Sequence, residues 1–411
     1  MTLGGRLPPS RASHSRSLDA RGTPTPYGAP VPQVLVLNAG SSSLKYQVVD
    51  PVTGDTPVRG TVERVDESGR EGALDVVLDA VREAGVDRDA LVGVGHRVVH
   101  GGDRFTEAVV IDEQVVEAID ELAVLAPLHN PPALSGIRLA RTAFPDSPQV
   151  AVFDTAWFSG LPAAATTYAL DRDLMEREGV RRYGFHGISH QYVAGEAARF
   201  LGRPPEELAL VVLHVGNGAS ASAVLDGVPV ETSMGLTPLE GLVMGTRGGD
   251  VDPGVLLHLL HRGYSVEDLE DLLNHRSGLQ GLAGMNDLRD LHAARARGDD
   301  RAETAYAVYC HRLRKYVGAY AAVLGRLDAV VFTAGVGERD PDVRADSLSG
   351  LGLLGIEVDP ERNVADASGA RVVSTDASVP VLVVPTNEEL SIARQVSVVV
   401  GGGGGLGGRR G

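Results

Sequence analysis

The chain has 411 residues and a formal net charge of −16, from 38 basic and 54 acidic residues. This length favours two domains, and the negative charge argues against nucleic acid and anionic lipid as partners. Apolar runs stay short of the roughly 18 residues that cross a bilayer, which argues against attachment to a membrane. The single cysteine, Cys310, excludes an intramolecular disulfide and fits a cytoplasmic location.

The two ends of the chain differ in composition from the rest. Residues 1–32 hold four arginines among Pro, Ser and Gly, and residues 400–411 are mostly glycine. Segments with so little apolar surface to bury cannot offset their own ordering entropy. We expect a disordered N-terminal extension at 1–32 and a flexible tail at 400–411.

Between the ends, short β-branched runs alternate with helical patterns. Strands are expected at 34–38, 44–50, 150–154, 208–214, 329–335 and 381–386. Apolar residues recur at helical spacing over 74–81 and 134–141, the latter after two prolines that suit a first helical turn, and a last helix begins near Leu390. This alternation is typical of an α/β fold.

Two segments 176 residues apart repeat one pattern. A gapless alignment of 34–50 with 210–226 pairs Asn38 with His214 and Val48 with Val224. Each segment reads as strand, Gly/Ser/Asn turn, strand, which suggests two related domains that each open with a phosphate-binding loop. Hairpin turns attract the same residue types in any protein, so the repeat alone fits both interpretations equally.

Glycine-rich turns follow three of the expected strands, at 38–43, 214–218 and 335–338. The chain has no GxxxxGK[ST] motif, which excludes a P-loop. Glycine lets backbone N–H groups approach an anion, and hydroxyl and amide side chains add donors. A plain turn explains any one of the three, whereas all three together favour a polyphosphate bound between two halves.

Two arginines lie among glycines, Arg97 in GHRVVHGG and Arg247 in GTRGGDVD. A guanidinium binds carboxylate or phosphoryl oxygens in bidentate fashion, so two of them can neutralise a phosphoryl group during transfer. A surface ion pair is the commoner role of a single arginine. The flanking glycines favour the functional interpretation.

Histidines and acids recur in comparable settings. His129 and His186, in PLHNP and YGFHG, are either donors to a developing anion or structural residues. Asp154 ends one expected strand and Glu388 follows another, at positions where α/β folds place ligands, and a carboxylate beside an amide such as Asn38 suits Mg²⁺. Helix capping is the alternative role for these acids.

Together these segments resemble the acetate kinase (acetokinase) family, within the superfamily that includes sugar kinases, the Hsp70 ATPase and actin. The motifs are NAGSSSLKY, GHRVVHGG, APLHNPP, FDTA, RRYGFHGISH, HVGNGAS, TSMGLTPLEGLVMGTR, FTAGVGE and VPTNEEL. The resemblance spans about residues 33–399. It implies an α/β fold of two duplicated ribonuclease-H-like domains with an active-site cleft between them, divided as 33–156 plus 390–399 and 157–389.

The resemblance also implies a reaction and its participants. The reaction is reversible, direct transfer of the γ-phosphoryl group of ATP to acetate, with Mg²⁺ or Mn²⁺ as cofactor. The second domain would carry nucleotide binding and homodimerisation. Since a carboxylate is already a nucleophile at neutral pH, such a transfer needs in-line positioning and charge neutralisation rather than a general base.

Individual roles follow from the same resemblance. It implies catalytic roles for Arg97, His129, Asp154, His186 and Arg247, and metal binding by Asn38 and Glu388. It implies acetate binding by Arg97, Val99, Leu128, Phe185 and Pro238. It implies nucleotide binding by Lys45, His214, Asn217, Gly218, Asp287, Leu288, Arg289, Gly335, Val336, Gly337 and Arg339.

The chain departs from the family's motifs at a few positions. FDTAFHQTMP has become FDTAWFSGLP, which introduces Trp157 and Phe158, and NPPN, MGTRSGD and GEN have become NPPA, MGTRGGD and GER, at Ala133, Gly248 and Arg339. These changes leave acceptor length and donor preference open. A propionate or butyrate kinase of the same family is the alternative, and a non-catalytic nucleotide switch of the actin or Hsp70 type is a more distant one.

Overall fold

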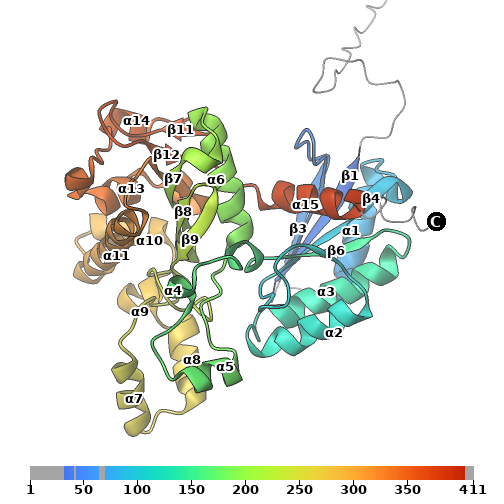
Figure 1. The fold of residues 1–411 in the computed structure, drawn as a ribbon, viewed down its shortest axis with the longest axis horizontal. Helices are drawn as coiled ribbons and strands as arrows, with labels where there is room; N and C mark the ends of the chain where they lie inside the picture. The colour runs from blue at the N-terminus through green and yellow to red at the C-terminus, as the bar shows by residue number, and fades with distance from the viewer. Residues whose placement is uncertain (1–31, 41–42, 64–69, 403–411) are drawn as a thin grey trace, which may run out of the picture.

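In a computed structural model of the protein, residues 32–40, 43–63 and 70–402 are described. The chain forms two lobes, each built round one six-stranded mixed sheet (Figure 1). The expected extension lies outside the described residues up to residue 31, and the expected tail does so from residue 403 onward. Within the described residues, no helix combines the length and apolar character needed to cross a membrane.

The first sheet holds three parallel strands at its centre. Its strands are β1 (Gln33–Ala39), β2 (Ser43–Val49), β3 (Val58–Glu63), β4 (Leu91–Val98), β5 (Val109–Val110) and β6 (Gln149–Phe153). They lie in the order β3-β2-β1-β4-β6-β5, with β1, β4 and β6 parallel and every other pair antiparallel. The carboxyl ends of the parallel strands therefore meet at one edge, where α/β folds place ligands.

The second sheet repeats the first strand by strand. Its strands are β7 (Ala209–Val215), β8 (Ala219–Leu225), β9 (Val228–Thr232), β10 (Ala329–Thr333), β11 (Arg371–Val372) and β12 (Val381–Val383). Their order is β9-β8-β7-β10-β12-β11, and each neighbouring pair has the same relative direction as its counterpart in the first sheet. The fold is a duplicated two-domain α/β fold.

The repeat seen in the sequence matches this duplication, but its gapless alignment is wrong by one residue after the turn. Four residues, 40–43, separate the paired Ala39 and Leu44, whereas three, 216–218, separate Val215 and Ala219. Val48 consequently corresponds to Ala223, not to Val224. The shorter turn in the second lobe shifts the whole second strand.

Helices cover both faces of both sheets. The α-helices of the described residues, not all of which lie against a sheet, are α1 (Arg70–Glu83), α2 (Glu113–Glu121), α3 (Asn130–Ala143), α4 (Ala163–Thr166), α5 (Arg172–Glu178), α6 (Gly187–Leu201), α7 (Pro253–His261), α8 (Val266–His275), α9 (Gly278–Ala283), α10 (Leu288–Ala296), α11 (Asp300–Leu324), α12 (Ala334–Arg339), α13 (Pro341–Leu348), α14 (Pro360–Val364) and α15 (Glu388–Gly402). The helices expected over 74–81, over 134–141 and near Leu390 are confirmed as parts of α1, α3 and α15.

All six expected strands are present, but two end at least two residues earlier than expected. The strand expected at 329–335 ends at Thr333, because Ala334 adopts a left-handed φ of 67° and begins α12. The strand expected at 381–386 ends at Val383, and four residues without regular secondary structure, 384–387, lead from there to α15. Because β10 and β12 are parallel, both shortened strands end at the same edge of the second sheet.

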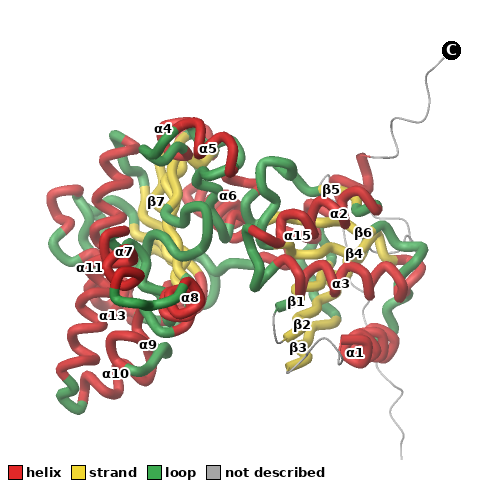
Figure 2. Tube along the Cα trace, turned by 90° about the horizontal axis from the view of Figure 1, so that it is seen from below, coloured by secondary structure: helices red, strands yellow, loops and turns green. Residues whose placement is uncertain are grey.

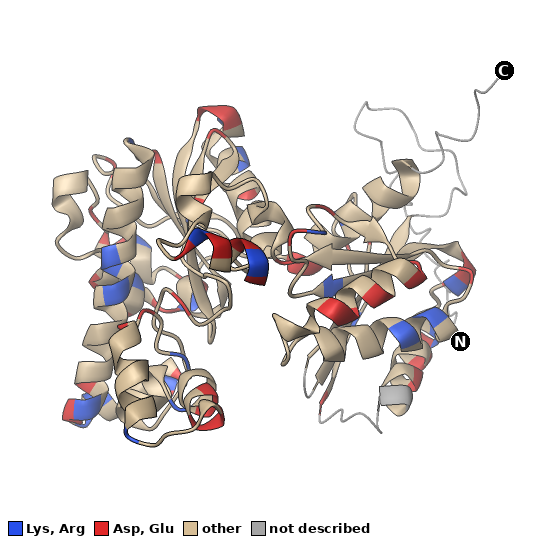
Figure 3. Cartoon of the chain, turned by 60° about the horizontal axis from the view of Figure 1, so that its bottom comes forward, with Lys and Arg blue, Asp and Glu red and all other residues tan. Residues whose placement is uncertain are grey.

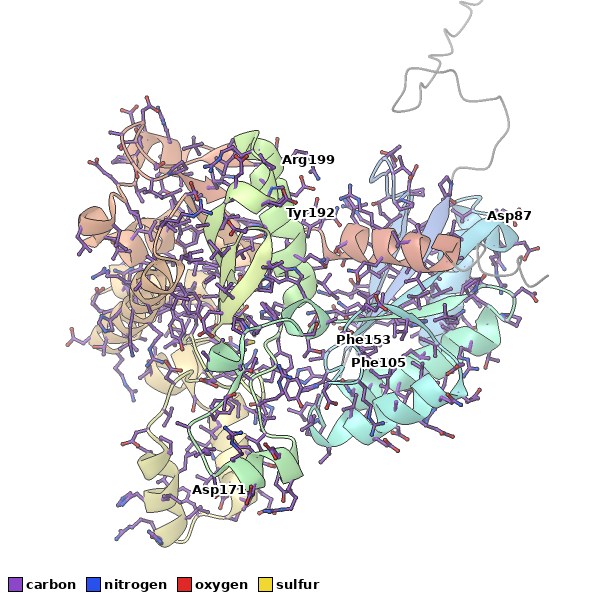
Figure 4. The ribbon with its side chains drawn as sticks, viewed as in Figure 1. Asp87, Phe105, Phe153, Asp171, Tyr192 and Arg199 are labelled. Carbon is purple, nitrogen blue, oxygen red and sulfur yellow. The ribbon has the colours of Figure 1, made fainter. Side chains whose placement is uncertain are left out.

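The first sheet is buried on both faces. Leu35 of β1 packs with Val77 of α1 on one face, while its neighbour Val34 packs with Ile392 of α15 on the other. Phe105 and Phe153 stack at 4.5 Å between ring centroids on the α2 and α3 side (Figure 4). Figure 2 shows α3 and α15 on opposite sides of β4.

The second sheet is covered in the same way. Val212 packs with Val193 of α6 on one face, and Leu213 packs with Leu313 of α11 on the other. Tyr192 of α6 contacts apolar residues of both lobes and lies beside α15 in Figure 4. Helices α6 and α15 thus form the packed contact that joins the lobes.

Helix α15 returns to the first sheet after the last strand of the second (Figure 1). We propose on this basis the domain division 33–156 plus 390–399 and 157–389. The helix continues through Gly402, which is three residues into the tail expected at 400–411. Lys, Arg, Asp and Glu are interspersed over both lobes (Figure 3).

His96 of β4 provides a test of the buried first sheet. Its side chain is almost fully buried, and Nε2 lies 2.8 Å from Gln149 Oε1. Burial lowers the pKa of His96 to about 4 from its ordinary 6.5. The unfolded chain therefore takes up a proton that the folded chain refuses, and the free energy of unfolding falls as the pH drops from about 6.5 towards 4.

We expect His96→Gln to shrink this pH dependence, because it removes one such proton. The measurement is the change in urea midpoint between pH 7 and pH 5 in wild type and variant. His311→Gln, at an exposed position, is the control and should leave that change as in wild type. An equal change in the His96 variant would contradict the prediction.

Candidate active site

Arg97 is held by two carboxylates at the edge where the parallel strands end. Asp154 follows β6, and its two oxygens lie 3.1 Å from Arg97 Nε and 2.8 Å from Nη2. Glu388, the first residue of α15, lies 3.1 Å from Nη1. Adjacent parallel strands bring Arg97 and Asp154 together, and the closing helix adds Glu388.

The two carboxylates of Asp154 and Glu388 favour the charged form of the Arg97 guanidinium. Burial by itself would lower the pKa of Arg97, but the charges of Asp154 and Glu388 outweigh it and raise that pKa. Burial raises the pKa of Asp154, and the bidentate contact with Arg97 opposes the rise. A fixed cation is thereby oriented before any ligand arrives.

Arg247 reaches the same region from the second lobe. Its Nη1 donates to the carbonyl of Pro238 at 2.8 Å, and no carboxylate of the described residues lies within ion-pair distance of it. Burial lowers the pKa of Arg247 to about 10, so the group stays charged at neutral pH. Its charge is left for an anionic ligand.

Two histidines stack beside these arginines. His186, with a left-handed φ of 60°, precedes α6, and its ring lies 4.2 Å from that of His214 on β7. Burial lowers the pKa of His186 well below its ordinary value and that of His214 to about 4. Both are neutral at neutral pH and can act there as hydrogen-bond donors rather than as cations.

Gly218 keeps open the space between these groups. A Cβ at this position would lie 2.8 Å from Arg247 Nη2 and 3.6 Å from His186 Nε2. Any side chain would displace the guanidinium, whereas glycine exposes its backbone to whatever lies between the arginine and the histidine.

A cavity between the lobes, which we call the interlobe cleft, gathers eight of the residues singled out in the sequence. They are Asn38, Lys45, Arg97, Val99, Leu128, His129, Asn217 and Arg247, accompanied by Ala39, Gly40, Ser43, Ala133, Thr246, Asn274 and His275. The first lobe supplies the hairpin of β1 and β2 and the ends of β4 and α3. The second supplies the loop that carries Arg247 and the end of α8.

A second cavity, which we call the second-lobe pocket, gathers most of the expected nucleotide-side residues. Asn217, Asp287, Leu288, Arg289, Gly335, Val336 and Arg339 line it, with Gly216, Gly245, Leu279, Asn286, His292, Tyr309, Asp340, Pro341 and Asp342. Asn217 lines both cavities, so the pocket and the cleft adjoin. An elongated ligand can extend from one into the other.

Several expected residues lie behind these cavities. Phe185 is fully buried in the second core, and the Pro238 carbonyl holds Arg247. The Gly337 carbonyl accepts a hydrogen bond at 3.0 Å from the buried Arg344. Lys45 lies in the cleft and does not line the second-lobe pocket.

Of the positions that depart from the family's motifs, some line one of the two cavities and others do not. Trp157 and Phe158 pack against His190, and neither lines the cleft. A Cβ at Gly248 would meet its neighbours at 3.6 Å or more, so nothing there is tightly packed. Ala133 lines the interlobe cleft and Arg339 the second-lobe pocket, where each changes what a ligand meets.

Sequence reasoning missed part of each cavity. Thr246, Asn274 and His275 lie in the cleft, and His292 and Asp340, whose side chains bond at 2.8 Å, lie in the pocket. Asn274 and His275 end a helix and carry no motif. Thr246 adjoins Arg247 in sequence, which is the one signal that pointed to it.

Two lobes with duplicated sheets, and a cleft that carries two oriented guanidinium groups beside neutral histidines, define the class of protein as a phosphotransferase. A family model described as the acetokinase family matches residues 59–394. The chain belongs to this family, and it is a kinase.

Solved structures agree with this assignment. An acetate kinase from Porphyromonas gingivalis is 38% identical, with a TM-score of 0.85 over 90% of this chain and 100% of that one. A propionate kinase from Francisella tularensis subsp. tularensis is 37% identical, with a TM-score of 0.83 over 89% and 98%. An acetate kinase from Entamoeba histolytica is 29% identical, with a TM-score of 0.81 over 89% and 98%.

Proposed function

We propose that this kinase transfers the γ-phosphoryl group of ATP reversibly to acetate, giving acetyl phosphate and ADP. The observation that carries the proposal is the pair Arg97 and Arg247, which line one cleft from opposite lobes. An acetate oxygen attacks the γ-phosphorus in line, and the bond to the bridging oxygen breaks with its electron pair left on ADP. No phosphoenzyme and no general base are required.

The side chains divide the remaining work. Arg97 and Arg247 neutralise the acceptor carboxylate and the equatorial oxygens of the transferring group. Asp154 orients the Arg97 guanidinium through its bidentate contact. His186 donates a hydrogen bond to the transferring phosphoryl group, and His129, at the start of α3, supports this group from the first lobe.

Asn38 and Glu388 are the residues we propose for Mg²⁺, with Mn²⁺ as a substitute. Both offer oxygen, the donor that these ions prefer. Leu37 pairs with His96 across β1 and β4, so Asn38 lies beside Arg97, and Glu388 contacts Arg97 at 3.1 Å. Asn38 and Arg97 also line the same cleft, so both proposed ligands lie near Arg97. When bound, the ion would neutralise phosphate charge.

We propose that the nucleoside lies in the second-lobe pocket and its phosphates point to the cleft. Asp287, Leu288, Arg289, Gly335, Val336 and Arg339 would surround the nucleoside, supported by Gly337. Lys45, His214, Asn217 and Gly218 would contact the phosphates. Asn217, which lines both cavities, would mark the junction between nucleoside and phosphates.

Propionate is the second candidate acceptor. Val99, Leu128 and Ala133 form an apolar side of the cleft, and Ala133 presents only a methyl group there. The propionate kinase from Francisella tularensis subsp. tularensis is almost as similar to this chain as the Porphyromonas gingivalis acetate kinase. One methylene in such a pocket changes selectivity by about 1–3 kcal/mol.

The test is an assay with ATP, Mg²⁺ and acetate, propionate or butyrate, in which acyl phosphate is trapped with hydroxylamine. We expect product from acetate with the highest kcat/KM, falling about tenfold or more per added methylene. A higher value for propionate would replace acetate as the acceptor. Nucleotide binding without acyl phosphate from any acid would overturn the proposal in favour of a nucleotide switch.

We expect Arg97→Ala and Arg247→Ala to lower kcat strongly, by about 2–4 kcal/mol of transition-state stabilisation, and to leave ATP binding largely intact. The same assay gives kcat, and calorimetric titration gives ATP affinity. Arg104→Ala, which removes an exposed ion pair with Glu121, is the control and should behave as wild type. Near-normal turnover in both test variants would refute the roles.

We further propose that the protein is a cytoplasmic homodimer. Helix α7 reads PGVLLHLLH, yet none of its residues is buried in the single chain, and Leu257 is 59% exposed. Val255 and Leu260 are exposed on the same helix. A helix so apolar gains stability by packing against a second copy.

We expect Leu257→Glu to weaken the dimer, because it places a charge on that apolar surface. Light scattering after gel filtration should give a dimer mass for wild type and a shift towards monomer for the variant. Leu353→Glu, at an exposed position outside α7, should stay dimeric. A Leu257 variant with an unchanged dimer would locate the interface elsewhere.

A further inference from the structure

Behind the interlobe cleft, two histidines and two serines form a buried chain of hydrogen bonds. His186 Nδ1 lies 2.9 Å from Ser220 Oγ, and His190 Nε2 lies 2.7 Å from the same oxygen. His190 Nδ1 then lies 2.9 Å from Ser222 Oγ. Ser220, Ser222 and His190 are fully buried.

If both histidines stay neutral and the buried Ser220 hydroxyl donates its proton within this chain of hydrogen bonds, the protons can be arranged in only two ways. A neutral imidazole has one N–H and one acceptor nitrogen, and a serine hydroxyl has one proton to donate. If Ser222 donates to His190 Nδ1, then His190 Nε2 donates to Ser220. Ser220 in turn donates to His186 Nδ1, which leaves the proton of His186 on Nε2.

The opposite arrangement puts the proton of His186 on Nδ1 and a lone pair on Nε2. Nε2 is the ring nitrogen on the side of Gly218, since Nε2 and its neighbour Cε1 lie 3.6 Å and 3.5 Å from the position of a Gly218 Cβ, and Arg247 Nη2 lies 2.8 Å from the same position. A lone pair there would repel a phosphoryl oxygen, whereas an N–H would bind it. Phosphoryl transfer therefore needs the first arrangement.

We propose that Ser220 and His190 are positioning residues that hold His186 as its neutral Nε2–H tautomer, with the donor aimed into the interlobe cleft. The proposal rests on the function given above. It adds a reason why two serines and a second histidine lie buried on β8 and α6 without lining the interlobe cleft or the second-lobe pocket.

The buried hydrogen-bond chain of His186, Ser220, His190 and Ser222 contains no carboxylate, and this matters for the charge of His186. A carboxylate at the position of Ser220 would favour the imidazolium, because an opposite charge stabilises the charged form. A serine orients the ring and leaves it neutral, as the lowered pKa values of His186 and His190, caused by burial, also indicate. A neutral donor releases the product anion more readily than a cation does.

His214 belongs to a second, similar chain of hydrogen bonds. Its Nδ1 lies 2.8 Å from Ser189 Oγ, which lies 2.8 Å from Thr386 Oγ1. The hydroxyls of Ser189 and Thr386 can point its proton in the same way. Because the two chains share no residue, Ser220 can be altered without touching the second one.

The experiment replaces Ser220 with Ala and reads both the tautomer and the rate. Long-range ¹H–¹⁵N spectra of histidine-labelled protein report which ring nitrogen carries the proton, and His186→Gln assigns the signal. We expect an Nε2–H tautomer in wild type and a mixture in the variant. We also expect kcat to fall about tenfold, with KM for ATP and acetate within about twofold of wild type.

Ser233→Ala is the matched control. Ser233 is also fully buried in the second lobe, and its hydroxyl accepts from Ala221 N at 2.8 Å rather than from a histidine. It should lose comparable stability but keep the tautomer and kcat of wild type. Ser222→Ala, one step further along the chain, should shift the tautomer in the same direction by a smaller amount and serves if Ser220→Ala does not fold.

An Nδ1–H tautomer in wild-type protein, or an unchanged tautomer in both serine variants, would overturn the proposal. The spectra need no substrate, so this result is separable from a failure of the proposed function. If wild type forms no acyl phosphate but shows the expected tautomer shift, the reaction is wrong and the hydrogen-bond chain is right. If the tautomer shifts and kcat stays unchanged, the hydrogen-bond chain has no role in the reaction.

Discussion

The bidentate contact between Arg97 and Asp154, extended by Glu388, is the interaction on which the rest of the site depends. It joins the ends of β4 and β6 to the first residue of α15, so it ties the geometry of the cleft to the closure of the first lobe. Removing one partner from such a buried group leaves an uncompensated charge, which costs several kcal/mol. The Arg97 guanidinium is therefore held in place only when β4, β6 and α15 are all correctly folded.

The cleft separates charge from hydrogen bonding. Its permanent positive charge comes from arginines, one paired with carboxylates and one without a carboxylate partner among the described residues. His186 and His214, which stack beside these arginines, are kept neutral by burial and have hydroxyl groups as hydrogen-bond partners. An anion that gains and loses charge during transfer thus meets a constant field, and the protonation state of the site does not need to change in each turnover.

Much of the fold could be predicted from local pattern, and the site could not be predicted from pattern alone. Continuous apolar runs located β1, β6 and β7, because a strand buried on both faces is apolar at nearly every position. The end of β10 was misjudged, since a single left-handed residue, Ala334, stops a strand that the composition would continue. Arg97 and Arg247 stood out through their glycines, whereas the pairing of Ser220 with two histidines depends on a register that sequence does not reveal.

Helix α15 has a consequence for how the chain is made. It is synthesised after every strand of both sheets, yet Ile392 and Val396 complete the apolar face of the first sheet. On the ribosome the first lobe must wait with one side of β1 and β4 uncovered, while the second lobe can assemble from contiguous sequence. The part of the protein that emerges first is thus the last to become native, and in that interval its uncovered apolar surface is open to aggregation.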